Sequence, residues 1–314
     1  MPRKTILGVI TLLLLIYMLA MVFNIQQVKA GTITVPDNYP TIQAALEASN
    51  NGDIIFVRAG VYFENVVVDK SVSLVGENAA TAIIDGGGSG TVIYITANNV
   101  QVTGFTIRNS GGWPSYGVRI EDVNNCNVFR NNLTNNWCDI RLYYSSNNSI
   151  AENIITNSEI GIWVANSLNN SITKNTITNN NYGIEIDYCS ENNINENDIM
   201  TNNYGIVLTS ASNNNIYHNN FINNADQIDS FDSVNAWDDG YPSGGNYWSD
   251  YTGIDNNGDG IGDTAYIINT NNQDRYPLIN QWIILEFPQS SMLISLISLT
   301  TIFLIYLKKR TAKN

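Results

Sequence analysis

The chain has 314 residues and is strongly acidic, with 28 Asp and Glu against 15 Lys and Arg and a formal net charge of −13. Seven of the basic residues lie in the two terminal segments, so only eight face the 28 acidic residues between residues 31 and 290. A field of this sign repels nucleic acid and anionic membrane surfaces and attracts cations, which argues against a nucleic-acid partner.

The N-terminus has the pattern of a secretion signal. Arg3 and Lys4 precede an apolar run that ends at Phe23, and Ala30 closes the segment ahead of Gly31. We predict a signal peptide over residues 1–30. The run is also long enough to remain as an uncleaved anchor.

A short amphipathic helix is predicted next, within an N-terminal cap and first irregular coils at residues 31–116. Thr41 opens the helix and Gly52 follows its end. Its apolar face consists of Ile42, Ala45 and Leu46. Such a helix can cover the open end of a stacked β-structure.

Five consecutive units of 22 residues then run without a break from Gly117 to Asp226. A period in the twenties marks a solenoid, whose single unit cannot bury its own apolar face. Each unit holds two short runs of alternating β-branched residues, which favours strands, and the leucine-rich signature is absent. The sequence therefore predicts one all-β parallel β-helix, with regular coils of about 22 residues over residues 117–230.

One column of the repeat is asparagine in every unit. Asparagine tolerates left-handed backbone angles at a tight corner, and stacked amides can hydrogen-bond along the axis. We interpret this column as structural. Its members are Asn131, Asn153, Asn175, Asn197 and Asn219.

The outward positions of the first strand in each unit form the candidate binding face. Side chains alternate along a strand and coils repeat every ~4.8 Å, so outward columns line one face. Aromatic platforms beside arginines and carboxylates suit a sugar chain. The two columns are Arg119, Arg141, Trp163, Glu185 and Val207, and Glu121, Tyr143, Ala165, Asp187 and Thr209. The carbohydrate-binding residues predicted from them are Arg119, Arg141, Tyr143, Trp163, Glu185 and Asp187.

Glu185 and Asp187 are also the candidate catalytic pair. Alternate residues of one strand stand about 7 Å apart, near the range of glycosidase carboxylates. The alternative is a solvated face with scattered charges, because ten outward positions often include two carboxylates.

A further polar column alternates in charge from coil to coil. Opposite charges one coil apart are predicted to set the register of the stack. The alternative is catalytic, with the histidine of the column as a general base beside its glutamate neighbour. The members are Arg130, Glu152, Lys174, Glu196 and His218.

The segment DNNGDGIGD at residues 255–263 has the spacing of a calcium loop. Oxygen ligands at alternate positions, with glycine at the sharp turn, suit a hard cation of flexible geometry. Tyr266 stands where an EF-hand needs a bidentate glutamate, so the site depends on Asp250 or Asp274 to complete it. We predict a structural Ca²⁺ in a C-terminal cap at residues 231–285, and the alternative is a metal-free turn. The predicted ligands are Asp255, Asn257, Asp259, Ile261 through its carbonyl group, and Asp263.

A transmembrane anchor with a basic tail is predicted over residues 286–314. Residues 292–307 are apolar apart from Ser and Thr, and three basic residues follow directly. Both basic clusters belong on the cytoplasmic side, which places the intervening chain outside the cell. The alternative is a buried terminal strand or helix.

The three cysteines are predicted to be unpaired. Cys126 and Cys189 lie three coils apart, about 14 Å at ~4.8 Å per coil, and Cys138 lies more than two coils from Cys189. Cys126 and Cys138 share a coil but sit on different sides of it. With one histidine and no Cys-x-x-Cys motif, the chain lacks a ligand set for zinc or haem.

Three segments resemble a known family. YPTIQAALEASNNGDIIFVRAGVYFENVVVDKSVSLVGE, followed by IIDGGG, resembles the opening of right-handed β-helix proteins of the NosD and carbohydrate-binding (CASH) type, which have the pectin-lyase fold. GGNYWSDYTGIDNNGDGIGDTAYII with QDRYPL is similar to the closing segment of archaeal NosD-like surface proteins, and EFP at residues 286–288 resembles an archaeal sorting signal. The resemblance spans residues 31–310 and implies a right-handed fold, a surface location and a carbohydrate theme, without a defined activity.

Three functions follow. The leading one is a membrane-anchored surface protein that binds glycans or builds the cell envelope without catalysis. The second is a polysaccharide lyase or glycoside hydrolase, although lyases of this fold place a basic residue beside Ca²⁺ and here the arginines lie far from the calcium-like loop. The third, from the NosD resemblance, is an accessory role in copper-enzyme maturation, for which one histidine and five dispersed methionines offer few ligands.

Overall fold

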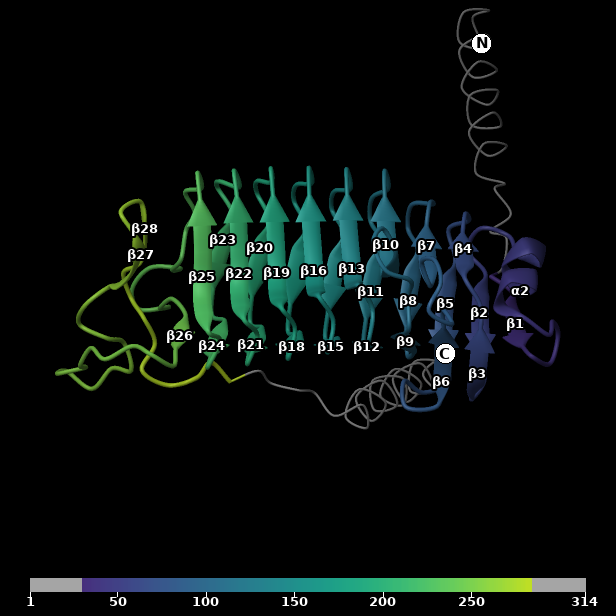
Figure 1. The fold of residues 1–314 in the computed structure, drawn as a ribbon, viewed down its shortest axis with the longest axis horizontal. Coiled ribbons are helices and arrows are strands. Elements are labelled where there is room, and N and C mark those ends of the chain that lie inside the picture. Colours follow the sequence, from purple (N-terminus) through teal and green to yellow (C-terminus); the bar gives the residue numbers. More distant parts are fainter. Residues whose placement is uncertain (1–29, 284–314) are drawn as a thin grey trace, which may run out of the picture.

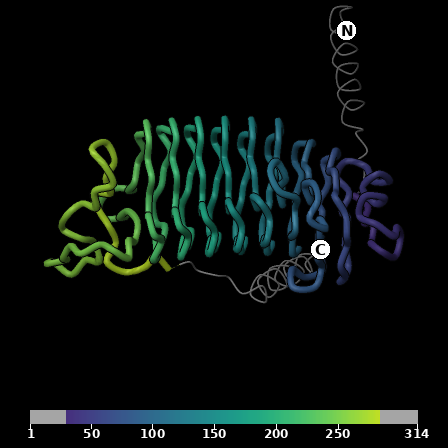
Figure 2. Tube along the Cα trace, in the orientation of Figure 1, coloured from purple at the N-terminus to yellow at the C-terminus, as the bar shows by residue number. Residues whose placement is uncertain are grey.

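In most of the molecule each turn of the chain contributes one short strand to each of three parallel sheets (Figure 1). The structure is a computed structural model and describes residues 30–283. Two sheets have nine strands and the third has eight, and the turns stack into an elongated body whose long axis crosses the strands (Figure 2). The predicted all-β parallel solenoid is confirmed.

The sheets are named A, B and C here. Sheet A consists of β1 (Thr32–Val35), β2 (Ile54–Val57), β5 (Ser73–Gly76), β8 (Gln101–Thr103), β11 (Asn127–Phe129), β14 (Ser149–Ala151), β17 (Ser171–Thr173), β20 (Asn193–Asn195) and β23 (Asn215–Tyr217). Sheet B consists of β3 (Gly60–Phe63), β6 (Ala82–Asp85), β9 (Thr106–Arg108), β12 (Asn132–Thr134), β15 (Ile154–Thr156), β18 (Thr176–Thr178), β21 (Asp198–Met200), β24 (Asn220–Ile222) and β26 (Tyr247–Trp248). Sheet C consists of β4 (Val66–Val68), β7 (Ile93–Ile95), β10 (Tyr116–Glu121), β13 (Cys138–Tyr143), β16 (Ile160–Ala165), β19 (Tyr182–Asp187), β22 (Tyr204–Thr209) and β25 (Asp226–Phe231). An antiparallel hairpin of β27 (Tyr266–Asn269) and β28 (Asn272–Asp274) follows.

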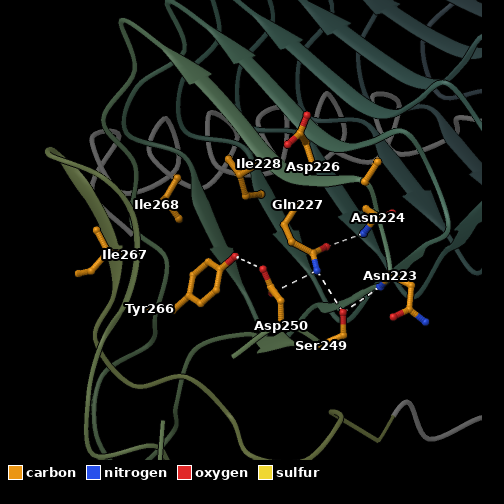
Figure 3. A pocket seen from close by; sticks show the side chains of 11 residues that line it. Asn223, Asn224, Asp226, Gln227, Ile228, Ser249, Asp250, Tyr266, Ile267 and Ile268 are labelled. Carbon is orange, nitrogen blue, oxygen red and sulfur yellow. Dashed lines mark hydrogen bonds between the residues drawn. The ribbon is translucent and has the colours of Figure 1, made fainter. Parts of the chain in front are cut away.

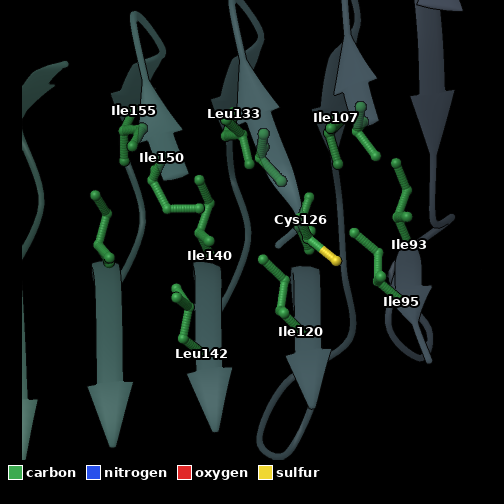
Figure 4. Packing of buried hydrophobic residues seen from close by; sticks show 14 of the residues in the cluster. Ile93, Ile95, Ile107, Ile120, Cys126, Leu133, Ile140, Leu142, Ile150 and Ile155 are labelled. Carbon is green, nitrogen blue, oxygen red and sulfur yellow. The ribbon is translucent and has the colours of Figure 1, made fainter. Parts of the chain in front are cut away.

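The inward positions of all three sheets form one continuous apolar core. The register repeats every 22 residues in the regular coils, so that Ile140 pairs with Ile162 and Ile162 with Ile184. Side chains of one kind therefore stack on their equivalents in the next coil, as Ile120 does on Leu142 (Figure 4). Burial of these stacked residues is the main force that holds the coils together.

Buried asparagines form hydrogen-bonded ladders at all three corners of the coil. In the predicted column, each side-chain N–H donates to Oδ1 of the asparagine one coil further on, at 2.9–3.2 Å. The same oxygens accept backbone N–H groups, so these buried amides are satisfied within the stack. Two more ladders, which the sequence analysis did not identify, include Asn148, Asn170, Asn192 and Asn214, and Asn180, Asn202 and Asn224.

The predicted position of the left-handed backbone, at the asparagine itself, is wrong by one residue. The residue before each asparagine has the positive φ, between 55° and 58°, and these residues are Arg130, Glu152, Lys174, Glu196 and His218. The asparagine itself turns inward, because its amide bonds to the next coil.

A column of glycines marks the closest approach of successive coils. A Cβ on Gly161, Gly183 or Gly205 would lie 2.5 Å from the carbonyl oxygen of the next coil. The column ends at Gln227, in the last strand of sheet C, where no further strand of residues 30–283 stacks. Asp139 is the member of the column that carries a side chain between two glycines, and its Oδ1 accepts the side-chain N–H of Asn136 at 2.7 Å.

The N-terminal end of the core is covered by α2 (Ile42–Ala48), as predicted. The Oγ1 of Thr41 accepts a hydrogen bond from the backbone N–H of Ala44 at 3.2 Å, which caps the helix. The three residues of the predicted apolar face are buried against the first strands.

Aromatic rings close the C-terminal end. Phe221, Trp248 and Tyr266 stack in order, with centroids 4.4 and 4.1 Å apart. Asp274 fixes this stack, because its Oδ2 accepts the indole N–H of Trp248 at 2.9 Å and the backbone N–H of Asn246 at 2.7 Å. Burial raises the pKa of Asp274 to about 6, although these hydrogen bonds oppose the shift.

The cysteines are unpaired and buried, as predicted. The predicted anchor lies outside the described residues, as does the predicted signal peptide except for its last residue. Between residues 30 and 283, no helix has both the length and the apolar character required to cross a membrane.

Candidate functional site

The six predicted carbohydrate-binding residues lie together on the outward face of sheet C. Their strands, β10, β13, β16 and β19, are consecutive in the sheet. The register places Arg119 beside Arg141, Arg141 beside Trp163, and Trp163 beside Glu185. The second column places Tyr143 two coils from Asp187. We call this surface the sheet C face.

Arg141 is enclosed by aromatic rings. Its Cζ lies 4.3 Å from the centroid of Trp163, 4.4 Å from that of Tyr143 and 5.0 Å from that of Tyr116. Its Nη1 donates a hydrogen bond to the hydroxyl of Tyr116. A guanidinium held against rings in this way gains cation–π stabilisation and keeps a fixed orientation.

Arg119 belongs to a hydrogen-bonded polar group at the N-terminal side of the same face. Its Nη2 lies 2.6 Å from the carboxylate of Glu121, which also accepts the hydroxyl of Tyr94 at 2.5 Å. Burial alone would raise the pKa of Glu121, but the hydrogen bonds from Tyr94 and Arg119 outweigh it, so this pKa is lowered. Glu121 therefore stays charged and orients the arginine.

Two further tryptophans, Trp113 and Trp137, extend the face beyond the predicted residues. The centroid of Trp137 lies 4.8 Å from that of Trp113 and 6.1 Å from that of Trp163. Trp113 stands on the loop before β10 and has 60% of its surface exposed. This cluster covers a small outward apolar core that includes Tyr116 and is separate from the main one.

Sequence reasoning missed Tyr94, Trp113, Tyr116 and Trp137. Trp113 falls in an irregular segment ahead of the first regular unit. Tyr94 pairs with Arg119 in sheet C, but it precedes Arg119 by 25 residues (119 − 94 = 25), so the 22-residue period does not reveal it. The available signal was the spacing of three tryptophans by roughly one coil each along the chain.

The candidate catalytic pair lies on β19, at the C-terminal edge of the sheet C face. Burial raises the pKa of Glu185 to about 7, and the charge of Asp187 adds to the shift. Asp187 accepts the indole N–H of Trp163 at 2.8 Å, so it positions that ring. Glu185 is therefore the carboxyl group of the pair that is suited to proton exchange near neutral pH, and Asp187 is engaged as a hydrogen-bond acceptor.

The alternating charged column forms two separate ion pairs. Arg130 lies 2.6 Å from Glu152, and Lys174 lies 3.5 Å from Glu196. His218 does not extend the ladder: its ring stacks on Trp282 at 3.7 Å and its Nε2 lies 3.1 Å from the carbonyl oxygen of Ser243. This packing gives His218 a structural place at the C-terminal end.

The predicted calcium loop is held by its own hydrogen bonds. The two carboxylate oxygens of Asp255 accept the backbone N–H groups of Gly258 and Gly260 at 2.7 and 2.8 Å. Asp259 accepts the N–H of Ile261 at 2.9 Å, which is the main cause of its lowered pKa. Across residues 30–283, no three His, Cys, Asp or Glu side chains are grouped as a metal site. The Ca²⁺ remains a prediction.

A polar pocket of about 420 Å³ lies at the C-terminal end, between β25 and β27 (Figure 3). The hydroxyl of Tyr266 donates to Asp250 at 3.0 Å, and the side-chain amide of Gln227 donates to Ser249 at 3.1 Å. Asp226 also lines the pocket and is the register neighbour of Tyr204, whose ring stacks on Tyr182 at 5.3 Å. The pocket therefore lies at the C-terminal end of sheet C, where β25 is two strands beyond β19.

The protein is therefore a parallel β-solenoid. The outward face of one of its sheets carries aromatic rings, arginines and carboxylates. The sequence profile of the family described as "Periplasmic copper-binding protein (NosD)" matches residues 46–253. The chain belongs to the NosD family, as its sequence resemblance indicates.

The other similarities to known proteins cover less of the chain or have low sequence identity. A "Cell surface glycoprotein" of Methanothermus fervidus is 32% identical over 136 residues, a match that covers 42% of this chain and 22% of that protein. The matched part of the chain thus spans about a fifth of that relative's length. An alginate lyase from Paenibacillus sp. str. FPU-7 has a TM-score of 0.39 and 11% identity over 68% of this chain and 96% of that one. The A-module of mannuronan C-5 epimerase AlgE4 from Azotobacter vinelandii has a TM-score of 0.41 and 15% identity over 62% and 76%.

The family description names copper, but residues 30–283 do not provide the ligands of a copper site. Copper in proteins is held by clustered Cys, Met and His side chains. His218 is stacked on Trp282, and Met200 is the one methionine between residues 30 and 283. Burial raises the pKa of the Cys138 and Cys189 thiols, which disfavours the thiolate that binds metals.

Proposed function

We propose that this protein binds polysaccharide at the cell surface, without catalysis, through the sheet C face. The observation that carries the proposal is the arrangement around Arg141, whose guanidinium lies against Tyr143 and Trp163 beside Glu185 and Asp187. Rings supply flat apolar area for the faces of sugars, and the charged groups around them bond to hydroxyls.

The rigidity of this face supports binding. Trp163 is positioned by Asp187, and Arg119 by Glu121, before any ligand arrives. Preorganised side chains lose little conformational entropy on binding, so more of the contact energy contributes to affinity.

The proposed location follows from two sources. The names of the family and of the matched relative contain "periplasmic" and "cell surface". The terminal segments carry the sequence patterns of a signal and an anchor. Attachment to the membrane at the C-terminus is part of the proposal.

A second candidate function is polysaccharide cleavage, as a lyase or glycoside hydrolase. Its support is Glu185, because a carboxyl group with a pKa of about 7 can donate or accept a proton at neutral pH. The non-catalytic function is preferred because both arginines of the face are already held, Arg119 by a carboxylate and Arg141 by a tyrosine hydroxyl.

Substitution of Trp163 tests the proposal. We expect the full chain, purified in mild detergent, to bind one or more polysaccharides of a neutral and acidic panel, and Trp163→Ala to weaken that binding at least tenfold, because the central platform is lost. Isothermal titration calorimetry measures this, with reducing ends counted in parallel.

The matched control is Phe63→Ala, which removes a ring that is 73% exposed on a sheet B strand. Equal weakening in both variants contradicts a specific site on sheet C. Release of reducing ends that Glu185→Gln abolishes establishes the enzymatic alternative instead.

A further inference from the structure

Each of the last six strands of sheet C ends in a corner residue with a left-handed backbone, and these corners form a ridge along the solenoid. The φ angles lie between 47° and 55°. In four corners the residue is Asp, Asn or Ser, all small and polar, while two corners carry tyrosine. The ridge residues are Asp122, Tyr144, Asn166, Tyr188, Ser210 and Asp232.

Tyrosine is an unfavourable choice at these corners. A left-handed backbone strains residues with a bulky side chain, and only Gly, Asn and Asp adopt it readily. The corner between sheets A and B also carries bulky residues with a left-handed backbone. Two of them, Arg130 and Glu152, form an ion pair across coils that offsets the strain. A tyrosine on the ridge requires a comparable compensation.

The fold provides little compensation for the two tyrosines. Tyr188 is 65% exposed, and within residues 30–283 its side chain makes no hydrogen bond and no contact with another ring. Tyr144 is 55% exposed and contacts the ring of Tyr143 at 4.3 Å. Backbone strain that the fold does not offset is a mark of function, and exposed rings serve function by contact with a ligand.

Two exposed rings of the ridge stand two coils apart, and a third exposed ring continues the spacing in the column beside it. Tyr144 and Tyr188 are two coils apart, about 9.6 Å at ~4.8 Å per coil. Phe231, which is 71% exposed, lies beside the ridge in the column of Tyr143 and Asp187. It ends β25 two coils beyond Asp187, and the ridge residue next to it is Asp232. The corners between them carry Asn166 and Ser210, which leave gaps. This spacing is close to the length of two sugar units in an extended chain.

The ridge borders the sheet C face. Tyr143, next to Tyr144, stacks on the guanidinium of Arg141, and Asp187, next to Tyr188, bonds to Trp163. The carboxylates of Asp122, Asp187 and Asp232 along this border can accept hydrogen bonds from sugar hydroxyls, and they repel acidic chains.

We infer that Tyr144, Tyr188 and Phe231 are platforms for every second ring of a neutral, β-1,4-linked polysaccharide that runs along the solenoid axis. The inference rests on the proposed function and names its ligand. A chain of this linkage is extended and turns successive rings over, so equivalent faces recur every two units. An α-1,4-linked chain curves and cannot follow a straight row.

The test compares β-1,4-linked gluco-oligosaccharides of four and eight units with α-1,4-linked ones of the same lengths, by calorimetry on the full chain. We expect the eight-unit β-linked chain to bind the wild type at least tenfold more tightly than the four-unit chain. In the double variant Tyr144→Asn/Tyr188→Asn this gain should disappear. Its Tm should equal or exceed that of the wild type, because asparagine suits the left-handed corner.

Five outcomes overturn the inference. The double variant binds like the wild type while Trp163→Ala loses binding: the ridge is then not part of the binding site, and the proposed function stands. Binding of other glycans but not of β-1,4-linked ones, or equal binding of the α-linked chain, removes the ligand class alone. A large fall in Tm of the double variant shows that the tyrosines serve the fold. No binding of any glycan by the wild type removes both proposals.

Discussion

At Glu185 the sheet C face holds a carboxyl group whose proton is exchangeable near neutral pH. Burial, with the charge of Asp187, raises its pKa from 4.5 to about 7. The folded chain therefore binds more protons than the unfolded chain between these pH values, so this group's contribution to stability is full below pH 4.5 and is lost as pH rises to 7.

We expect Glu185→Gln to remove this pH dependence. Above pH 7 the variant should be more stable than the wild type by about 1–2 kcal/mol, a value reduced for the partial exposure of the carboxyl group, and the difference should shrink towards pH 4.5. Urea unfolding at pH 4.5, 6 and 8 measures it. Glu47→Gln, an exposed glutamate on α2, is the control. Parallel profiles for the wild type and Glu185→Gln would show that the pKa of Glu185 is not raised.

Among the elements, the coils depend on a glycine column as well as on their apolar stacks. A Cβ at Gly183 would lie 2.5 Å from the carbonyl oxygen of Gly205 in the next coil, so the two strands would have to separate. We expect Gly183→Ala to lower the free energy of unfolding by roughly 1–3 kcal/mol, as overpacking does in other cores. Chemical denaturation measures this.

Gly112 provides the matched comparison, because a Cβ there would meet no atom within 4 Å. Gly112→Ala should change stability by less than about 0.5 kcal/mol. If both alanine variants were equally stable, the close approach of the coils would not limit the fold.

For the whole molecule, the repeat period carried most of what the sequence could predict. It assigned the strands, placed ten outward side chains on one face and identified one of three asparagine ladders. Trp113, Tyr94 and the ladder at Asn148 were missed, because the first two lie in irregular coils and the third is interrupted by Cys126 at its first position. The partner of His218 was beyond prediction, since Trp282 reaches it only through the folding of the C-terminal segment.

The C-terminal cap is where a bound ion would affect the whole solenoid, because the stack of Phe221, Trp248 and Tyr266 closes the core there. The loop at residues 255–263 precedes Tyr266 directly, so an ion that orders the loop would stabilise the cap. We expect millimolar Ca²⁺ to raise the Tm of the full chain by several degrees, since saturation at 100 times Kd adds about 2.7 kcal/mol. Asp259→Asn should abolish the shift, and Asp69→Asn, an exposed carboxylate near α2, should preserve it. A Tm that does not respond to Ca²⁺ would identify the loop as a hydrogen-bonded turn, in which the backbone N–H groups that now face Asp255 and Asp259 satisfy these carboxylates without a metal.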